Sequence, residues 1–117
     1  MKDHSDLLYL VHIDEAAKGI EDTVVVQGRS SLDDALVRDA TIYRMQTLSE
    51  STQRLSPFFK SQHPDIPWRQ LAGFRNQLAH GYLGVDLDIV WSIIERDLPL
   101  LAQCVRTELA VQLEHRD

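Results

Sequence analysis

The sequence DLDIVWSIIERDLPLLAQCVRTELAVQL, residues 86–113, decides the fold class of this protein. Its apolar side chains recur at steps of 4, 4, 3, 4 and 4 residues, at Val90, Ile94, Leu98, Leu101, Val105 and Leu109. Steps of three and four residues return to the same face of an α-helix, so the run predicts a long amphipathic helix. We expect Asp86 or Asp88 to open it and Pro99 to kink it, because proline has no amide hydrogen to donate.

Two earlier segments predict helices of the same kind. Residues 6–26 repeat the spacing, with inward positions expected at Leu7, Leu10 or Val11, Ala17, Ile20 and Val24. A turn at residues 27–30 follows, because Gly28 interrupts the pattern. Ser31 is expected to cap a second helix that runs to about Leu55. Its inward positions are expected at Leu32, Leu36, Ile42 or Tyr43, Leu48 and Leu55.

A third helix is expected between Asp65, as its cap, and Gly81, as its stop. Pro67 is tolerated in the first turn, where its missing amide costs little. One side of this helix carries Trp68, Leu71, Phe74 and Leu78. The preceding residues 56–67 contain three prolines and predict only a short turn around Phe58 and Phe59. No segment has a competing strand pattern, so the sequence predicts an all-α, antiparallel bundle of four to five helices with a kinked C-terminal helix.

Length and composition fit this class. The 117 residues give room for one domain, residues 1–117, with one hydrophobic core. The first residues are charged and lack the apolar stretch of a secretory signal, and no apolar run approaches the roughly 20 residues that span a bilayer. The single cysteine, Cys104, predicts neither an internal disulfide nor a thiolate metal site. We therefore expect a soluble, cytoplasmic protein without a membrane segment.

Charge is distributed unevenly along the chain. The formal net charge is −6, which argues against a protein that coats nucleic acid by bulk attraction. Residues 51–85, however, contain one acid, Asp65, against Arg54, Lys60, Arg69 and Arg75. This local excess of positive charge is either chance clustering in a short chain or a site for an anionic ligand.

The segment IPWRQLAGFRNQLAHGYLGVD, residues 66–86, carries the candidate chemistry. On a helical wheel Arg75 flanks the apolar stripe, where a guanidinium is costly unless it is paired or offered to a ligand. Asn76 and His80 are four residues apart and share a face with Arg69 and Gly73. A glycine in a helix interior costs about 0.5–1 kcal/mol relative to alanine, so Gly73 suggests that something approaches the backbone there.

Each of these residues also has a purely structural interpretation. Arg75 is compatible with an ion pair to Glu50 or Asp39, and His80 with a helix-capping histidine. Five residues along a helix turn through about 140°, so Arg75 and His80 of one chain do not point the same way. Their convergence requires the reach of arginine, distortion of the helix end, or a second copy of the chain.

The extended segment resembles the RX4-6H motif of HEPN ribonucleases and, more narrowly, the R-x4-H-x-Y form of HepT-like toxins. The similarity includes Arg75, His80 and Tyr82, and it extends upstream to residues 66–69 and downstream through residues 84–91 and 95–99. It also takes in residues 38–39, 42–46 and Glu50, so that about 70 of the 117 residues match in order. A bare arginine–histidine spacing would be a weak signal, whereas the extended run is a strong one.

The resemblance implies a metal-independent endoribonuclease whose cleft is formed by a homodimer. RNA carries its own nucleophile, the 2′-hydroxyl, so the protein supplies proton transfer and charge stabilisation. His80 would be the general base or acid, Arg75 would hold the scissile phosphate, and Asn76 would orient either group. The products would be a 2′,3′-cyclic phosphate and a 5′-hydroxyl. No cofactor is implied.

Tyr82 matches the tyrosine that, in HepT-like toxins, is AMPylated by a partner MntA-like nucleotidyltransferase antitoxin. The resemblance therefore implies a toxin–antitoxin pair in which an adenylate at Tyr82 obstructs the cleft. Two alternatives remain open: a non-catalytic helical module that docks a nucleotidyltransferase, and a degenerate domain that binds RNA or nucleotide without cleavage. Arg38, Gln46 and Glu50 match the family pattern without an assigned role.

The remaining side chains that bind metals or bases predict no second site. His4, His12, His63 and His115 are scattered, with no two at a four-residue spacing that would hold zinc. Asp86 and Asp88 stand at an expected helix start, where acids act as caps. Trp68 and Trp91 fall on or near apolar stripes, so we expect core packing for both, while Phe58 and Phe59 offer support for a dimer interface.

Overall fold

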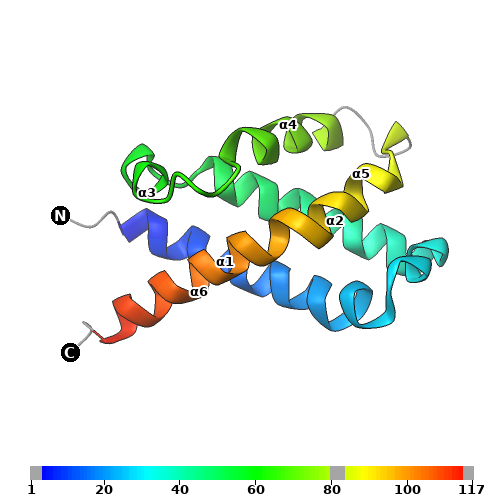
Figure 1. The fold of residues 1–117 in the computed structure, drawn as a ribbon, viewed down its shortest axis with the longest axis horizontal. Helices are drawn as coiled ribbons and strands as arrows, with labels where there is room; N and C mark the ends of the chain where they lie inside the picture. The colour runs from blue at the N-terminus through cyan, green and yellow to red at the C-terminus, as the bar shows by residue number, and fades with distance from the viewer. Residues whose placement is uncertain (1–3, 80–83, 115–117) are drawn as a thin grey trace.

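The computed structural model describes residues 4–79 and 84–114, and these residues form a bundle of helices (Figure 1). The main helices are α1 (His4–Ile20), α2 (Ala35–Gln53), α4 (Trp68–Ala79) and α6 (Leu98–Glu114). Shorter ones are α3 (Pro57–Gln62) and α5 (Leu87–Ser92). Two π-helical segments, η1 (Glu21–Val25) and η4 (Ile93–Asp97), and one 3-10 segment, η2 (Arg29–Asp33), join them. The described residues include no strand, which confirms the all-α prediction.

The helices alternate in direction. Figure 1 shows α1 and α4 running one way and α2 and α5–α6 running back. Helix α2 packs against both α1 and α4, and α6 lies across α1. The antiparallel arrangement predicted from the sequence is therefore confirmed, with α3 as a short additional helix where only a turn was expected.

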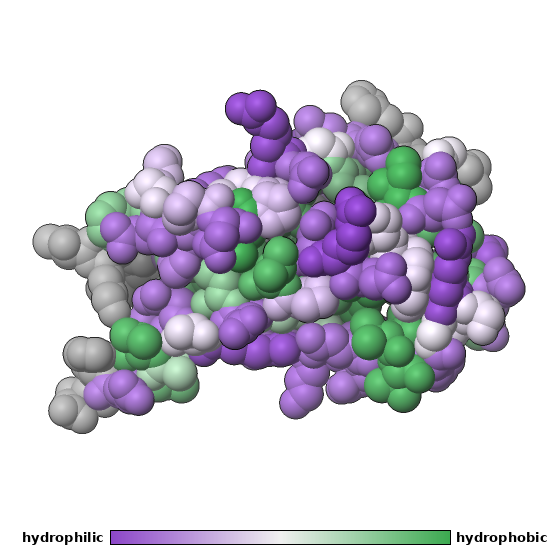
Figure 2. Space-filling view, in the orientation of Figure 1, coloured by the Kyte–Doolittle hydropathy of each residue, from purple (hydrophilic) through white to green (hydrophobic). Residues whose placement is uncertain are grey.

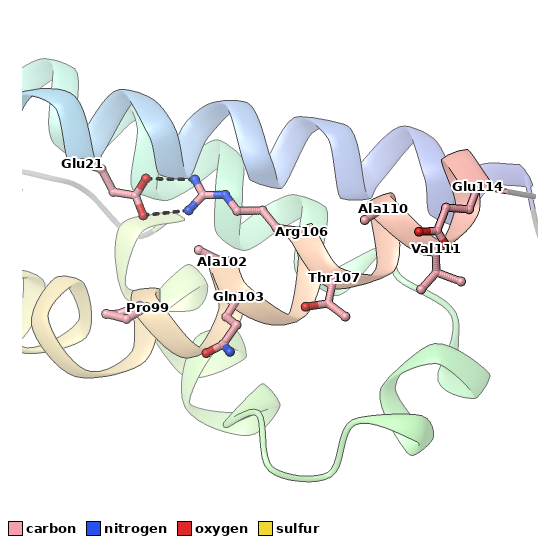
Figure 3. Close-up of a pocket in the computed structure, with 9 residues that line it drawn as sticks. All are labelled: Glu21, Pro99, Ala102, Gln103, Arg106, Thr107, Ala110, Val111 and Glu114. Atoms are coloured by element: carbon pink, nitrogen blue, oxygen red, sulfur yellow. Dashed lines mark hydrogen bonds and ion pairs between the residues drawn. The ribbon is translucent and has the colours of Figure 1, made fainter.

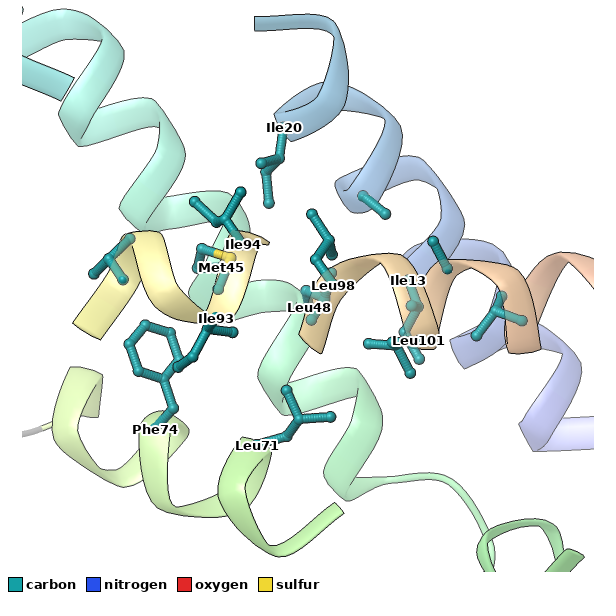
Figure 4. Close-up of a cluster of buried hydrophobic side chains, with 14 of the residues drawn as sticks. Ile13, Ile20, Met45, Leu48, Leu71, Phe74, Ile93, Ile94, Leu98 and Leu101 are labelled. Carbon is teal, nitrogen blue, oxygen red and sulfur yellow. The ribbon is translucent and has the colours of Figure 1, made fainter. Parts of the chain in front are cut away.

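One core joins the four long elements. Figure 4 shows side chains from α1, α2, α4, η4 and α6 pointing toward one another, among them Met45, Leu48, Phe74 and Ile93. Of the predicted positions on the C-terminal run, Val90, Ile94, Leu98, Leu101 and Val105 are buried, and Leu109 is partly buried. Trp68 and Trp91 are partly buried against the same core, as expected.

One inward position was predicted wrongly: Leu36 is 81% exposed. At the two places where the pattern left a choice, Leu10 and Ile42 are buried, whereas Val11 and Tyr43 are exposed. On α2 the buried face carries hydroxyl residues that the apolar pattern overlooked: Thr41, Ser49 and Thr52 are buried. Each donates its hydroxyl hydrogen to a backbone carbonyl of the preceding turn, at Val37, Met45 and Ser49 respectively, at 2.6–2.7 Å. Because these hydroxyls are satisfied inside the helix, they can face the core at little cost.

The helix starts also differ in part from the prediction. Asp34, not Ser31, caps α2, because its carboxylate accepts from the amides of Leu36 and Val37 at 2.8 and 3.3 Å. Ser31 instead donates to the Gly28 carbonyl within η2. The turn at Gly28 is confirmed, and its φ of 90° is a conformation that glycine adopts readily. Asp86 caps α5, as expected, by accepting from the Asp88 amide at 2.8 Å.

The C-terminal helix is interrupted near Pro99, as predicted. Regular α-helical bonding gives way to π-helical bonding over Ile93–Asp97, just before Pro99 in the first turn of α6. Proline removes the amide that would have closed the preceding turn, so the backbone rearranges there. The interruption turns Arg96 and Asp97 toward α4, where they line a groove described below.

Arg106 on α6 fastens the bundle to α1 and η1. Its guanidinium donates to Asp14 Oδ1 at 2.7 Å. It also donates to both carboxylate oxygens of Glu21, at 2.9 and 3.1 Å, as Figure 3 shows. These hydrogen bonds raise the pKa of Arg106 above its usual value, with Glu21 contributing most. Among the described residues, no helix is long and apolar enough to span a lipid bilayer.

Candidate functional site

Helix α4 presents the arginine and the asparagine of the motif on the surface. Its buried side carries Leu71, Phe74 and Leu78, which pack into the core. Because Arg75 and Asn76 follow Phe74 directly, the helical turn places them outside that buried side, and both are exposed. The burial of Phe74 therefore fixes the orientation of the next two residues.

The Arg75 guanidinium is held by its neighbour. Its Nη1 atom donates to the Asn76 Oδ1 atom at 3.3 Å. Arg75 forms no ion pair with any residue that the structure describes, and Glu50, one of the partners considered above, accepts instead from Gln46 at 3.4 Å. The guanidinium thus retains most of its five donors for an anionic ligand.

Arg75 is not buried against the apolar stripe. The helical wheel predicted a guanidinium close to that stripe, where it would be costly to leave unpaired. The side chain is instead exposed, so it keeps its hydration and needs no partner for stability. Its availability, and not a desolvation cost, makes it a candidate phosphate ligand.

Gly73 was expected to admit a close neighbour. It is exposed, and a Cβ atom built on it would meet no atom within 4 Å among the described residues. Nothing in the described part of the chain approaches its backbone, so the expectation is not met within one protomer. The glycine leaves open space beside α4.

His80 and Tyr82 lie outside the described residues, as does Gly81, the expected stop of α4. The structure therefore tests neither the convergence of Arg75 with His80 nor the setting of Tyr82. The proposed roles of Arg75 and Asn76 likewise remain predictions about chemistry, although their mutual contact is now defined.

Positive charge gathers along α3 and α4. Lys60 on α3 lies over the Trp68 ring, 6.0 Å from its centroid, and burial lowers its pKa while Asp6 opposes this change. Arg69 and Arg75 are exposed on α4. Figure 2 shows that hydrophilic side chains dominate the visible face, with apolar residues in separate patches. The basic segment identified in the sequence thus places two exposed arginines on α4 and a partly buried lysine on α3.

The helix-two residues of the family pattern have structural contacts. Arg38 donates from Nη1 to the Leu32 carbonyl at 3.1 Å, which ties α2 to η2. Gln46 donates to Glu50 one turn later. These contacts account for the residues locally and assign them no chemistry. Among residues 4–79 and 84–114, no cluster of three or more metal-binding side chains is present.

Two grooves indent the described surface. The first, of about 400 Å³, lies between α4 and the α5–η4 segment, and we call it the α4–η4 groove. Phe74, Ile89 and Ile93 supply its apolar part, whereas polar side chains come from Gln70, Gln77, Asp88, Ser92, Arg96 and Asp97. The second, of about 630 Å³, lies along the outer side of α6 beside Arg106 and Thr107 (Figure 3). The α4–η4 groove was not predicted from the sequence, where its only signal was Gly73, which lines it.

The fold and the site define a helical bundle that presents a solvent-exposed arginine on α4. The family model described as ribonuclease HepT-like matches residues 13–108. A protein named "Probable ribonuclease HepT" from Thermococcus cleftensis is 35% identical over 101 residues, covering 86% of this chain and 90% of the relative. A protein named "Putative RNase" from Methanocaldococcus jannaschii is 29% identical over 92 residues, which cover 78% of this chain and 84% of the relative. No solved structure matched. The chain belongs to the ribonuclease HepT-like family.

Proposed function

We propose that this protein is a metal-independent endoribonuclease, in which Arg75 binds the scissile phosphate and His80 transfers protons. The observation that carries the proposal is the exposed Arg75 guanidinium, bonded only to Asn76 among the described residues, in a chain of the ribonuclease HepT-like family. Such a guanidinium has donors left for two phosphate oxygens and needs no metal to neutralise them.

In the proposed reaction the 2′-hydroxyl oxygen attacks the adjacent phosphorus. Its proton passes to a base, and the bond to the 5′-oxygen breaks as that oxygen takes up a proton from an acid. His80 acts as one of these two groups. Arg75 stabilises the additional negative charge on the phosphate, and Asn76 holds the guanidinium in place through the 3.3 Å contact. The products carry a 2′,3′-cyclic phosphate and a 5′-hydroxyl.

Two protomers are proposed to form one cleft. The wheel separates positions 75 and 80 by about 140°, so a second copy supplies the missing group more readily than a single helix can. The motif also supports a regulatory role: a nucleotidyltransferase antitoxin transfers AMP from ATP to the Tyr82 oxygen and releases pyrophosphate. The added adenylate places a competing phosphate near Arg75 and neutralises the toxin.

Purified wild-type, His80→Ala and Arg75→Ala proteins, incubated with single-stranded RNA in EDTA, test the chemistry. We expect wild-type cleavage with cyclic-phosphate ends and a loss of about 100-fold or more in each variant, because proton transfer and phosphate stabilisation each contribute on that scale. Arg69→Ala, which changes an exposed arginine of the same helix, is the matched control and should retain most activity. If purified His80→Ala protein cleaved RNA at the wild-type rate, the proposal would be refuted.

Intact-mass measurement after co-expression with a nucleotidyltransferase encoded beside this chain tests the regulation. We expect added adenylate on the wild-type protein and none on Tyr82→Phe. Adenylate transfer without any RNA cleavage would favour the alternative of a non-catalytic module that serves only as a nucleotidyltransferase substrate.

A further inference from the structure

The α4–η4 groove has the composition of a site for a small planar ligand. Phe74 and Ile93 approach each other across the floor (Figure 4), and Ile89 extends the apolar surface. Small-molecule sites typically combine such a floor with a few polar groups that fix orientation. At about 400 Å³ the groove is large enough for one heterocyclic ring system.

The polar side chains around this floor have unused hydrogen-bonding capacity. Gln70, Gln77, Ser92 and Asp97 line the groove, and none of these side chains bonds to another residue in the described part of the chain. Together they offer amide donors, a hydroxyl and carboxylate acceptors. The lining carries the carboxylates of Asp88, which is ion-paired with Arg29, and Asp97 against the guanidinium of Arg96, so it favours a neutral polar ring over a phosphate.

Gly73 keeps the groove open. A Cβ atom at this position would point into empty space, since nothing lies within 4 Å of it. A glycine in mid-helix costs about 0.5–1 kcal/mol relative to alanine, and the described fold needs no glycine here for packing or for its backbone conformation. A flat ligand that approaches the helix backbone would account for the residue.

The groove and the proposed phosphate site share helix α4. Asn76 is three residues beyond Gly73, about 4.5 Å along the helix axis. Position 75 lies about 160° around the helix from Gly73 and Gln77, but the Arg75 guanidinium turns toward Asn76, with 3.3 Å between Nη1 and Oδ1. An RNA strand that passes around the exposed side of α4 at Asn76 would place a phosphate at Arg75 and a nearby base in the groove.

We propose that the α4–η4 groove is a base-binding subsite that prefers bases with an exocyclic amino group, adenine, cytosine or guanine, over uracil. This inference rests on the proposed ribonuclease function for its biological meaning. Asp97 accepts a hydrogen bond from the exocyclic amino group, while Gln70 and Gln77 bond to the ring edge and Phe74 and Ile93 contact the ring. Uracil has no amino group and leaves the carboxylate without a donor.

Binding of free nucleosides tests the groove without requiring catalysis. Adenosine, cytidine and uridine are titrated into isotope-labelled wild-type protein, and the side-chain amide signals of Gln70 and Gln77 are followed by NMR. We expect shifts with adenosine and cytidine, and an affinity for uridine at least about tenfold weaker, because a hydrogen bond to a charged group is worth roughly 1.5–3 kcal/mol. Equal shifts with all three nucleosides, or none, would overturn the proposal.

Gly73→Leu places a bulky side chain at the groove, where its Cβ atom would meet no atom within 4 Å, and leucine is a good helix former. We expect it to abolish the nucleoside shifts while the protein remains folded by circular dichroism. Thr107→Leu, which adds the same side chain to the second groove, is the matched control and should retain binding. Asp97→Asn should retain binding and lose the discrimination against uridine.

Cleavage of oligo(A), oligo(C) and oligo(U) separates this proposal from the proposed function. We expect kcat/KM for oligo(U) to be at least about tenfold lower, and the three values to converge in Gly73→Leu. Wild-type cleavage without base preference, together with no nucleoside binding, would refute the subsite and leave the ribonuclease intact. Selective nucleoside binding at Gln70 and Gln77 without RNA cleavage would refute the ribonuclease and leave the subsite intact.

Discussion

Arg106→Met removes a guanidinium that joins three elements of the bundle. Methionine retains an unbranched, largely apolar stem and deletes the hydrogen bonds to Asp14 at 2.7 Å and to Glu21 at 2.9 and 3.1 Å. The Arg106 side chain is 40% exposed, and those of Asp14 and Glu21 are 34% and 32% exposed, so water screens both ion pairs. Exposed pairs contribute up to about 1 kcal/mol, and the bidentate geometry with Glu21 is favourable.

Two such pairs give an expected loss of about 1–2 kcal/mol in the free energy of unfolding. Urea denaturation followed by far-UV circular dichroism measures it. Raising the salt from about 0.05 M to about 1 M should reduce the difference between wild type and variant, because the Debye length falls to about 3 Å. Arg69→Met, at an exposed arginine without an ion pair to the described residues, should change the unfolding energy by no more than about 0.5 kcal/mol.

A double-mutant cycle isolates the pair with Glu21. Combining Glu21→Gln with Arg106→Met should cost less than the sum of the two single changes, with a coupling of about 0.5–1 kcal/mol. Equal losses for Arg106→Met and Arg69→Met, with no coupling to Glu21 and no salt effect, would refute the view that these contacts stabilise the bundle.

Three further changes test separate features of the fold. Asp6→Ala removes the carboxylate that accepts from the Ser56 amide at 2.8 Å and from the Ser56 hydroxyl at 2.6 Å. It should lower the free energy of unfolding by about 1–3 kcal/mol, as measured by thermal melts. An unchanged stability would contradict a role for this contact in holding α3. Burial raises the pKa of the Cys104 thiol to about 11. Because the thiolate is the reactive form, alkylation by iodoacetamide at pH 8 should be roughly 100-fold slower than in urea-unfolded protein. Mass spectrometry measures the two rates. Burial also raises the Asp97 pKa, with Arg96 opposing, so the ionised carboxylate destabilises the fold above its folded-state pKa. Asp97→Asn should therefore increase stability at pH 7, and the gain should vanish once the pH falls below the unfolded-state pKa; a loss of stability at pH 7 would contradict this sign.

The sequence by itself determined the helical class and most of the core. Its three- and four-residue apolar steps located the long helices, because the period of an α-helix is a local property of the chain. The same steps placed Leu71, Phe74 and Leu78 in the core, and the exposure of Arg75 and Asn76 follows from their positions beside Phe74. The extended motif also indicated the family, which spans residues 13–108.

Tertiary structure alone decided the burial of side chains that the apolar pattern does not distinguish. On α2 the apolar pattern favoured Leu36, which is exposed, and overlooked Ser49 and Thr52, which are buried with their hydroxyls bonded within the helix. Only the fold brings η4 beside α4 to form the α4–η4 groove, since residues about 20 positions apart carry no common period. Local periodicity thus specifies the helices, and the packing of one helix on another decides which surfaces are left for ligands.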